Sequence, residues 1–163
     1  MGYEEFLGIE QLKSEQLDQL VLFQKWADES SWSTFHNSHY DWWAFPIDKP
    51  SAKGFRYSVS SEVVEALMLD ATFIEQLRKC SSLLLLSWGW DIDSQKLVDH
   101  PEQDQSWAML AVRLYKCNRS LKLFQQEDLV ASTQAYARHL MHQGIPLTYD
   151  GRDLSDDILR KGL

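Results

Sequence analysis

Residues 73–89 read FIEQLRKCSSLLLLSWG, and this stretch decides the fold class. Its apolar side chains recur at steps of one, three and four residues, which is the spacing of one face of an α-helix. The members of this stripe are Phe73, Ile74, Leu77, Cys80, Leu84 and Trp88. Asp70 is suited to cap the start of such a helix, and Gly89 to end it. We therefore predict a helix from about residue 70 to Trp88.

Helical patterns of the same kind lie on both sides of this stretch. One is predicted to begin at Ser14, a good N-cap residue, and to run to Asp28. Its apolar stripe consists of Leu17, Leu20, Val21, Phe23 and Trp26. Three more are predicted from Ser60 or Ser61 to Leu69, from Trp107 to Leu121 and from Leu129 to Met141, with a last helical turn capped by Ser155. Stripes joined by short connections bury one another, so we predict an all-α fold, an irregular bundle of four to five amphipathic helices in a single helical domain over residues 1–163.

Three segments lack the helical period. Residues 29–38 are rich in serine and residues 91–104 are polar, so both are predicted to be loops. Alternation of apolar and polar residues predicts a short extended segment over 55–59. Between them, residues 40–46 read YDWWAFP, and we call this segment the aromatic knot. Pro46 and Pro50 argue against a long helix directly after it.

The composition excludes several classes of function. The 163 residues carry a formal net charge of −8, which disfavours duplex nucleic acid and anionic membrane surfaces as partners. No apolar run approaches the ~18 residues of a membrane span. The two cysteines provide no disulfide framework, so a reducing, cytoplasmic location is expected. The chain has no glycine-rich phosphate loop, dinucleotide fingerprint or G-x-S-x-G motif, and no cofactor is predicted.

The strongest candidate for ligand binding combines the aromatic knot with a band of cations. Arg113, Lys116, Arg119 and Lys122 recur at steps of three on one predicted helix. In an acidic chain, this band is suited to an anionic ligand or an acidic partner, although a solvated helix face is the alternative. If the knot packs against this helix, its residues and the band line one pocket. The candidate ligand-binding residues are His39, Trp42, Trp43, Lys116 and Arg119.

The two adjacent tryptophans of the knot point in different directions in either a helix or a strand. One of them is then exposed and the other buried, or both complete the core, and the sequence leaves this open. Cys117 is also open to two interpretations. Neighbouring cations favour a reactive thiolate, whereas its place on an apolar stripe favours an inert buried thiol.

Histidine spacing suggests a metal site as a further alternative. His36 and His39 are three residues apart, and so are His139 and His142, which on a helix places each pair on one face. A metal site needs three or four converging ligands, and H-E-x-x-H is absent. The sequence therefore assigns no residue to a metal.

The aromatic knot also carries two family resemblances. His39, Trp42, Phe45 and Pro46, together with a later motif, resemble a small all-helical family of bacterial proteins of unknown function that is sometimes labelled calpastatin-like. The later motif consists of Lys116, Ser120, Leu121, Leu123 and Phe124. Tyr40, Trp43, Phe45 and Pro46 are similar to the conserved region of opioid growth factor receptors. Both resemblances imply an α fold around the knot, and neither implies a reaction.

The function expected from the sequence is a non-enzymatic binding or interaction domain for a protein or a small anionic ligand. One alternative is an enzyme that acts on a phosphate-bearing substrate through His39, Trp42, Lys116 and Arg119. The other is a metal-binding protein based on the histidine pairs.

Overall fold

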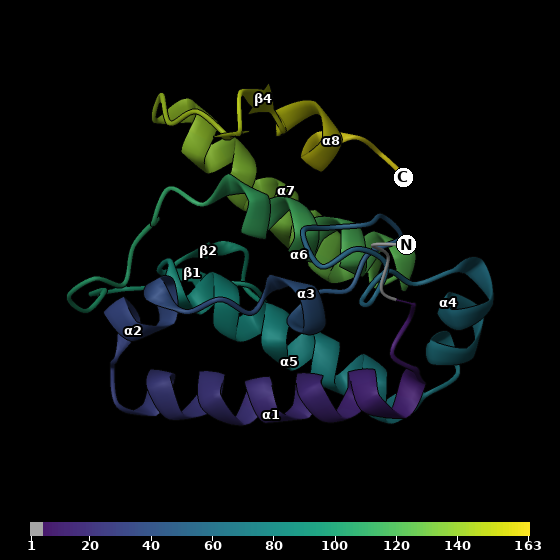
Figure 1. Cartoon of the computed structure of the whole chain (residues 1–163). Helices are drawn as coiled ribbons and strands as arrows, with labels where there is room; N and C mark the ends of the chain where they lie inside the picture. Colours follow the sequence, from purple (N-terminus) through teal and green to yellow (C-terminus); the bar gives the residue numbers. More distant parts are fainter. Residues whose placement is uncertain (1–4) are drawn as a thin grey trace.

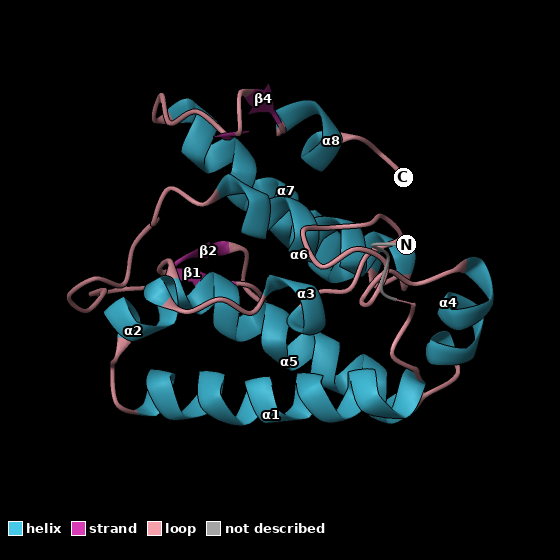
Figure 2. Ribbon diagram, in the orientation of Figure 1, coloured by secondary structure: helices cyan, strands magenta, loops and turns pink. Residues whose placement is uncertain are grey.

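The computed structural model describes residues 5–163, and residues 1–4 of the predicted domain lie outside the described residues (Figure 1). The fold is all-α, as predicted. Five longer helices form most of it: α1 (Ile9–Asp28), α4 (Ser61–Met68), α5 (Ala71–Ser87), α6 (Ala111–Leu123) and α7 (Glu127–His142). Three short helices are added: α2 (Trp32–Asn37), α3 (Asp41–Ala44) and α8 (Ser155–Leu159). Two antiparallel strand pairs are the only sheet structure in the described part, β1 (Trp90–Asp91) with β2 (Lys96–Leu97) and β3 (Thr148–Tyr149) with β4 (Arg152–Asp153) (Figure 2).

The helices are arranged around α5. Helix α1 packs along one side of α5, and the pair α6 and α7 lies on the other side, with α8 against that pair (Figure 1). The short helix α3 of the aromatic knot also packs on α1. The buried apolar side chains form one connected cluster that extends from Leu12 to Ile158. The long predicted stripes therefore bury one another, as their periodicity requires.

Helix α5 begins and ends where the sequence predicts. The Asp70 carboxylate accepts a hydrogen bond from the Phe73 backbone N–H at 3.1 Å and so caps the helix. Gly89 follows the last turn with φ +83°, a conformation that favours glycine. A Cβ at Gly89 would lie 2.9 Å from the Gln105 carbonyl oxygen, so the residue also permits a close approach of the loop before α6.

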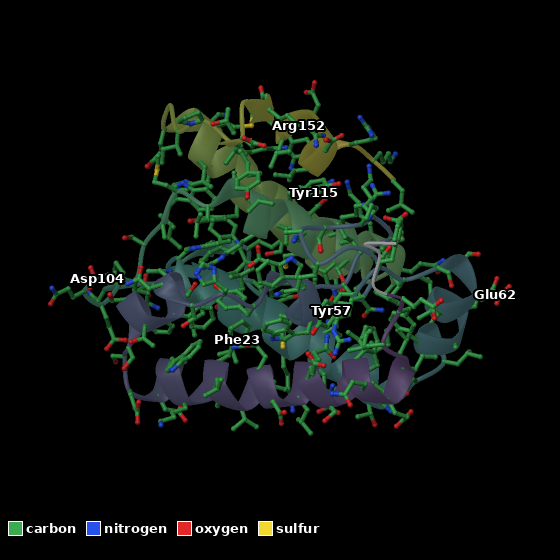
Figure 3. All side chains as sticks on the ribbon, viewed as in Figure 1. Phe23, Tyr57, Glu62, Asp104, Tyr115 and Arg152 are labelled. Carbon is green, nitrogen blue, oxygen red and sulfur yellow. The ribbon has the colours of Figure 1, made fainter. Side chains whose placement is uncertain are left out.

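The first helix differs from its prediction in both its start and its buried face. It begins at Ile9, after Gly8, so Ser14 is an exposed residue inside the helix and not its cap. The buried residues are Leu12, Gln16, Gln19 and Phe23, and Figure 3 shows Phe23 on the side of α1 that faces the rest of the molecule. Leu17 and Val21 of the predicted apolar stripe are exposed.

Hydrogen bonds to the aromatic knot explain this choice of face. Gln16 Nε2 donates to the Ala44 carbonyl at 3.1 Å, and Gln19 Oε1 accepts from Trp43 Nε1 at 2.9 Å. These glutamines satisfy polar groups of the knot that would otherwise be buried without a partner. The face turned inward is therefore decided by a segment distant in the sequence.

Two predicted loops contain secondary structure. The serine-rich segment 29–38 contains α2, in which Trp32 and Phe35 lie one turn apart and are both buried. The polar segment 91–104 contains β2, which pairs with β1 at its start. Conversely, the segment predicted to be extended, residues 55–59, begins as a turn over 55–57. Local polarity concealed these elements because their stability comes from contacts with other helices.

Two helix starts are also displaced. Helix α6 begins at Ala111, not at Trp107, because Met109 adopts φ +63° and interrupts the helical conformation. Ser155 is the first residue of α8, and its hydroxyl donates to the Asp153 carboxylate at 2.7 Å. Nowhere in residues 5–163 is a helix both long enough and apolar enough to cross a bilayer.

Candidate functional site

The aromatic knot packs against α6, and Arg113 makes the central contacts. Its guanidinium lies 3.2 Å from the Asp41 carboxylate and donates to the Tyr40 hydroxyl at 2.9 Å. It also donates to the backbone carbonyls of His36, at 3.0 Å, and of Ser38. The Arg113 side chain is only 4% exposed. This cation of the basic band therefore holds the chain in place and is not available to a ligand.

Two further cations of the band are also bound within the molecule. The Arg119 guanidinium forms two hydrogen bonds with the Asp48 carboxylate, at 2.7 and 3.0 Å. Lys122 Nζ donates to the carbonyls of Asp157 and Ile158, at 3.0 and 3.3 Å. Arg119 is therefore paired with Asp48, just after the knot, and Lys122 is bound to carbonyls of α8.

Lys116 is the member of the band that meets the predicted pocket. Its ammonium lies 5.2 Å from the centroid of the Trp42 ring, and that of Lys53 lies 4.8 Å from the same ring. Burial lowers the pKa of Lys116. The hollow beside these groups has a volume of only about 10 Å³, which is barely room for one water molecule.

The structure therefore assembles part of the predicted site. It brings Trp42 and Lys116 together, whereas Arg119 is occupied by Asp48. His39 is exposed and does not line the hollow. Trp43 is half-buried, like Trp42, and its ring N–H is directed to Gln19 on α1. Neither tryptophan is fully core or fully exposed.

The other candidate groups are accounted for by packing. In the described part of the chain, no three His, Cys, Asp or Glu side chains form a group that could hold a metal ion. His139 stacks on the Tyr136 ring. Cys80 and Cys117 are both buried, and burial raises the pKa of the Cys117 thiol to about 12. The reactive-thiolate interpretation of Cys117 is therefore wrong.

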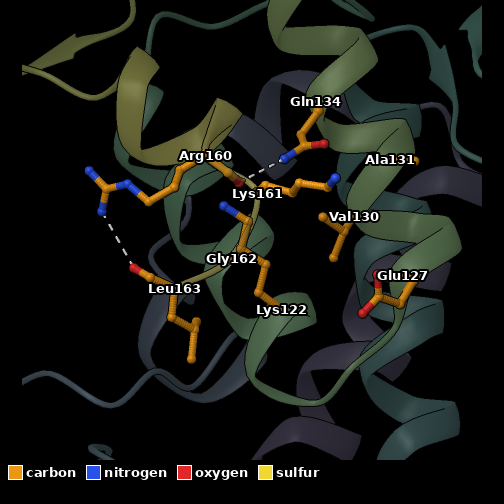
Figure 4. A pocket seen from close by; sticks show the side chains of 9 residues that line it. All are labelled: Lys122, Glu127, Val130, Ala131, Gln134, Arg160, Lys161, Gly162 and Leu163. Atoms are coloured by element: carbon orange, nitrogen blue, oxygen red, sulfur yellow. Dashed lines mark hydrogen bonds between the residues drawn. The ribbon is translucent and has the colours of Figure 1, made fainter.

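A pocket of about 260 Å³ lies between α7 and the C-terminal segment (Figure 4). Lys122, Arg160 and Lys161 line it, together with the carboxylate of Glu127. Lys122 is bound to carbonyls of α8, and Arg160 contacts Asp157 at 3.1 Å and the Leu163 carbonyl at 3.4 Å. The cations of this pocket mostly have partners already, and we assign it no ligand.

A larger cleft, of about 500 Å³, lies where the end of α5 meets the end of α7 and the loop before α6. Its volume is within the range of small-molecule sites. The ring-bearing side chains of its lining are Trp88, Trp107, Tyr136 and His139. The lining contains no Asp, Glu, Lys or Arg. At its rim, Leu97 and Met109 are 46% and 66% exposed.

The aromatic rings of the cleft are held in two orientations. The Trp88 and Tyr136 rings are 5.8 Å apart at an angle of 11°, and the Tyr136 and His139 rings are 6.2 Å apart at 18°. The Trp107 ring lies across them, 4.9 Å from Trp88 at 61° and 6.1 Å from Tyr136 at 64°. Trp88 and Tyr136 are 3% and 1% exposed, so these two rings mainly pack on their neighbours, and the half-buried Trp107 and His139 rings form the more open part of the wall.

Two polar groups of this cleft have no hydrogen-bond partner in the described chain. The Tyr136 side chain is only 1% exposed, and its hydroxyl takes part in none of the hydrogen bonds of residues 5–163. Burial raises its pKa. Trp107 Nε1 is likewise buried without an acceptor. The Tyr136 hydroxyl is not among the fully buried atoms that lack a partner, so the cost of about 1–3 kcal/mol for an unpaired buried group applies to Trp107 Nε1 and not to Tyr136.

The loop that forms one wall of the cleft is anchored to the rest of the fold. Trp32 Nε1 of α2 donates to Glu102 at 3.0 Å, and His36 Nε2 lies 2.7 Å from the Asp104 carbonyl. Figure 3 shows Asp104 at the edge of the molecule. Gln105 Nε2 donates to the Leu86 carbonyl at 2.9 Å, which fixes the loop to α5. Helix α2, absent from the sequence prediction, therefore positions a wall of the cleft.

Sequence reasoning did not predict this cleft. Trp88, Trp107 and Tyr136 each lie on a predicted helical stripe and were expected to be core residues. His139 was considered only as a metal ligand. The sequence does show several aromatic side chains that carry a polar atom. Whether they meet in space depends on tertiary packing.

Comparison of the chain with protein-family models, with curated proteins and with solved structures finds no match in any of the three. Neither of the two family resemblances is tested by these comparisons.

Proposed function

We propose that this protein is a non-enzymatic binding domain that holds a small ring-bearing molecule in the cleft of Trp88, Trp107 and Tyr136. The observation that carries this proposal is the Tyr136 hydroxyl, which has no hydrogen-bond partner within residues 5–163 and belongs to a side chain that lines an aromatic cleft. Ligand sites are mostly apolar hollows with a few well-placed polar groups, and this cleft has that composition.

Several features favour binding over catalysis at this position. The lining offers no carboxylate, thiol or amine, and no hydrogen bond joins the Ser106 hydroxyl to His139 in the described chain. The enzyme hypothesis placed its phosphate-bearing substrate beside His39 and Arg119, but Arg119 is paired with Asp48 and His39 lies outside the hollow. The metal hypothesis lacks a converging set of ligands among the described residues.

Isothermal titration calorimetry with a panel of small ring compounds, including indole, naphthalene and quinoline, tests the proposal. We expect saturable binding of at least one compound to the full chain. A Val98→Trp variant should lose this binding, because Val98 lines the cleft and the larger ring would fill it. A Lys116→Met variant is the matched control and should bind normally. Loss of binding in Lys116→Met but not in Val98→Trp would place the ligand at the knot instead.

A small anionic ligand at the aromatic knot is the second candidate. It is supported by Lys53 and Lys116, which both lie over the Trp42 ring and have no carboxylate within ion-pair distance in the described chain. Such a ligand would rest on the surface, because the hollow is too small to enclose it. Phosphate should then raise the thermal unfolding temperature of the native protein, but not that of Lys116→Met.

A further inference from the structure

We infer that the cleft selects an uncharged, flat heteroaromatic ring whose acceptor atom accepts a hydrogen bond from the Tyr136 hydroxyl. This inference rests on the function proposed above and narrows it to a chemical class. It makes Tyr136 the residue that determines specificity. Three properties of the cleft lead to it.

The first property is the polar group that the cleft leaves unpaired. The Tyr136 hydroxyl donates as well as accepts, and it has no partner among residues 5–163. Trp107 Nε1 also lacks an acceptor, but that atom is fully buried, so a ligand in the cleft does not reach it. A ligand that accepts a hydrogen bond from Tyr136 offers a ring nitrogen or a carbonyl oxygen. A hydrocarbon ring would leave the hydroxyl unpaired.

The second property is the absence of charge from the lining. No Lys or Arg lines this cleft, and neither does any Asp or Glu. Moving an ionised group from water into such surroundings is unfavourable unless a charged partner compensates it. The cleft therefore discriminates against carboxylates, phosphates and ammonium groups. This distinguishes it from the lysine-bearing surface at Trp42.

The third property is the shape of the walls. Trp88, Tyr136 and His139 lie nearly parallel, whereas Trp107 lies across them. Aromatic rings prefer offset stacking and edge-to-face contacts, and the half-buried Trp107 and His139 rings can offer such contacts to a flat guest. Met109 at the rim is flexible and polarizable, so it can adapt to rings of different outline.

Quinoline and naphthalene form a matched pair that isolates the acceptor. They have the same outline and differ only in one ring nitrogen. At mildly alkaline pH, where quinoline is uncharged, we expect the full chain to bind quinoline about tenfold more tightly than naphthalene, the effect of one or two added hydrogen bonds. Naphthalene-2-carboxylate should bind more weakly than naphthalene.

The isosteric variant Tyr136→Phe tests the residue. It removes the hydroxyl and keeps the ring, so the ratio of quinoline affinity to naphthalene affinity should fall from about ten to about one. Circular dichroism shows whether the variant is folded.

The outcomes separate this inference from the proposed function. Binding of naphthalene and quinoline with equal affinity would contradict the inference and leave the proposed function standing. A preference for quinoline that persists in Tyr136→Phe would also contradict it. If no compound binds, the proposed function fails, and the inference fails with it.

Discussion

The guanidinium of Arg113 on α6 lies 3.2 Å from the carboxylate of Asp41 in the aromatic knot, with side chains only 4% and 11% exposed. This pair joins two segments that are far apart in the sequence. Arg113 also binds the Tyr40 hydroxyl and two backbone carbonyls, so almost all of its hydrogen-bonding capacity is used inside the molecule. Arg113 therefore fixes the knot to α6, while Gln16 and Gln19 join it to α1.

Replacement of Arg113 with methionine should lower the free energy of unfolding by about 3–5 kcal/mol, because it leaves the Asp41 carboxylate buried without its partner. Urea denaturation followed by circular dichroism measures this. The matched control is Arg119→Met, whose ion pair with Asp48 is more exposed and should contribute about 1 kcal/mol or less. Equal losses in the two variants would show that Arg113 has no special role.

The two buried tyrosines provide a second comparison. Tyr40→Phe removes a hydroxyl that accepts a hydrogen bond from Arg113, and it should cost about 1.5–3 kcal/mol of unfolding free energy. Tyr136→Phe removes a hydroxyl without a partner among residues 5–163, so stability should be unchanged or should rise by about 1 kcal/mol. Both changes are measured by urea denaturation. A loss in Tyr136→Phe as large as that in Tyr40→Phe would mean that the Tyr136 hydroxyl is already satisfied.

Acid should destabilise the anchor of the cleft loop. Burial is the main cause that lowers the pKa of His36 below its ordinary value of about 6.5, and the neighbouring Arg113 also lowers it. Its Nε2 contacts the Asp104 carbonyl, while Nδ1 is buried without a partner, so a second ring proton has no acceptor. The unfolded chain then binds a proton more readily than the native protein does.

The sign of the pH effect follows from this difference. The stability contributed by neutral His36 is fully present above about pH 6.5 and is lost as the pH falls through the lowered pKa of the native state. We expect urea midpoints to decrease between about pH 6.5 and pH 5, and this decrease to be smaller in His36→Asn. His142→Asn, at an exposed histidine, should retain the full decrease. The same decrease in the native protein and in His36→Asn would assign the effect to another group.

The two thiols should be unreactive in the native protein. Cys80 and Cys117 are buried, and burial raises the pKa of both, so little thiolate is present and access is blocked. With Ellman's reagent we expect no fast reaction in buffer and reaction of both thiols in urea. Rapid modification of Cys117 in buffer would restore the hypothesis that it is a reactive residue.

The sequence by itself determined the fold class and the limits of helix α5. Helix α5 illustrates the reason, since its apolar period, its Asp70 cap and its Gly89 end are local properties. Periodicity does not reveal which face of α1 is buried, because Gln16 and Gln19 turn inward only where Ala44 and Trp43 need hydrogen-bond partners.

The candidate sites, like the helices, could be predicted from the sequence only in part. Sequence spacing brought Trp42 and Lys116 into one hypothesis, and the structure places them in contact. Only the tertiary structure could decide that Asp48 occupies Arg119 and that Trp88, Trp107 and Tyr136 converge. Side chains on different helices meet through the packing of those helices, and the free energy of that packing comes from contacts between residues far apart in the chain. No local pattern encodes such contacts, so the aromatic cleft became visible only in three dimensions.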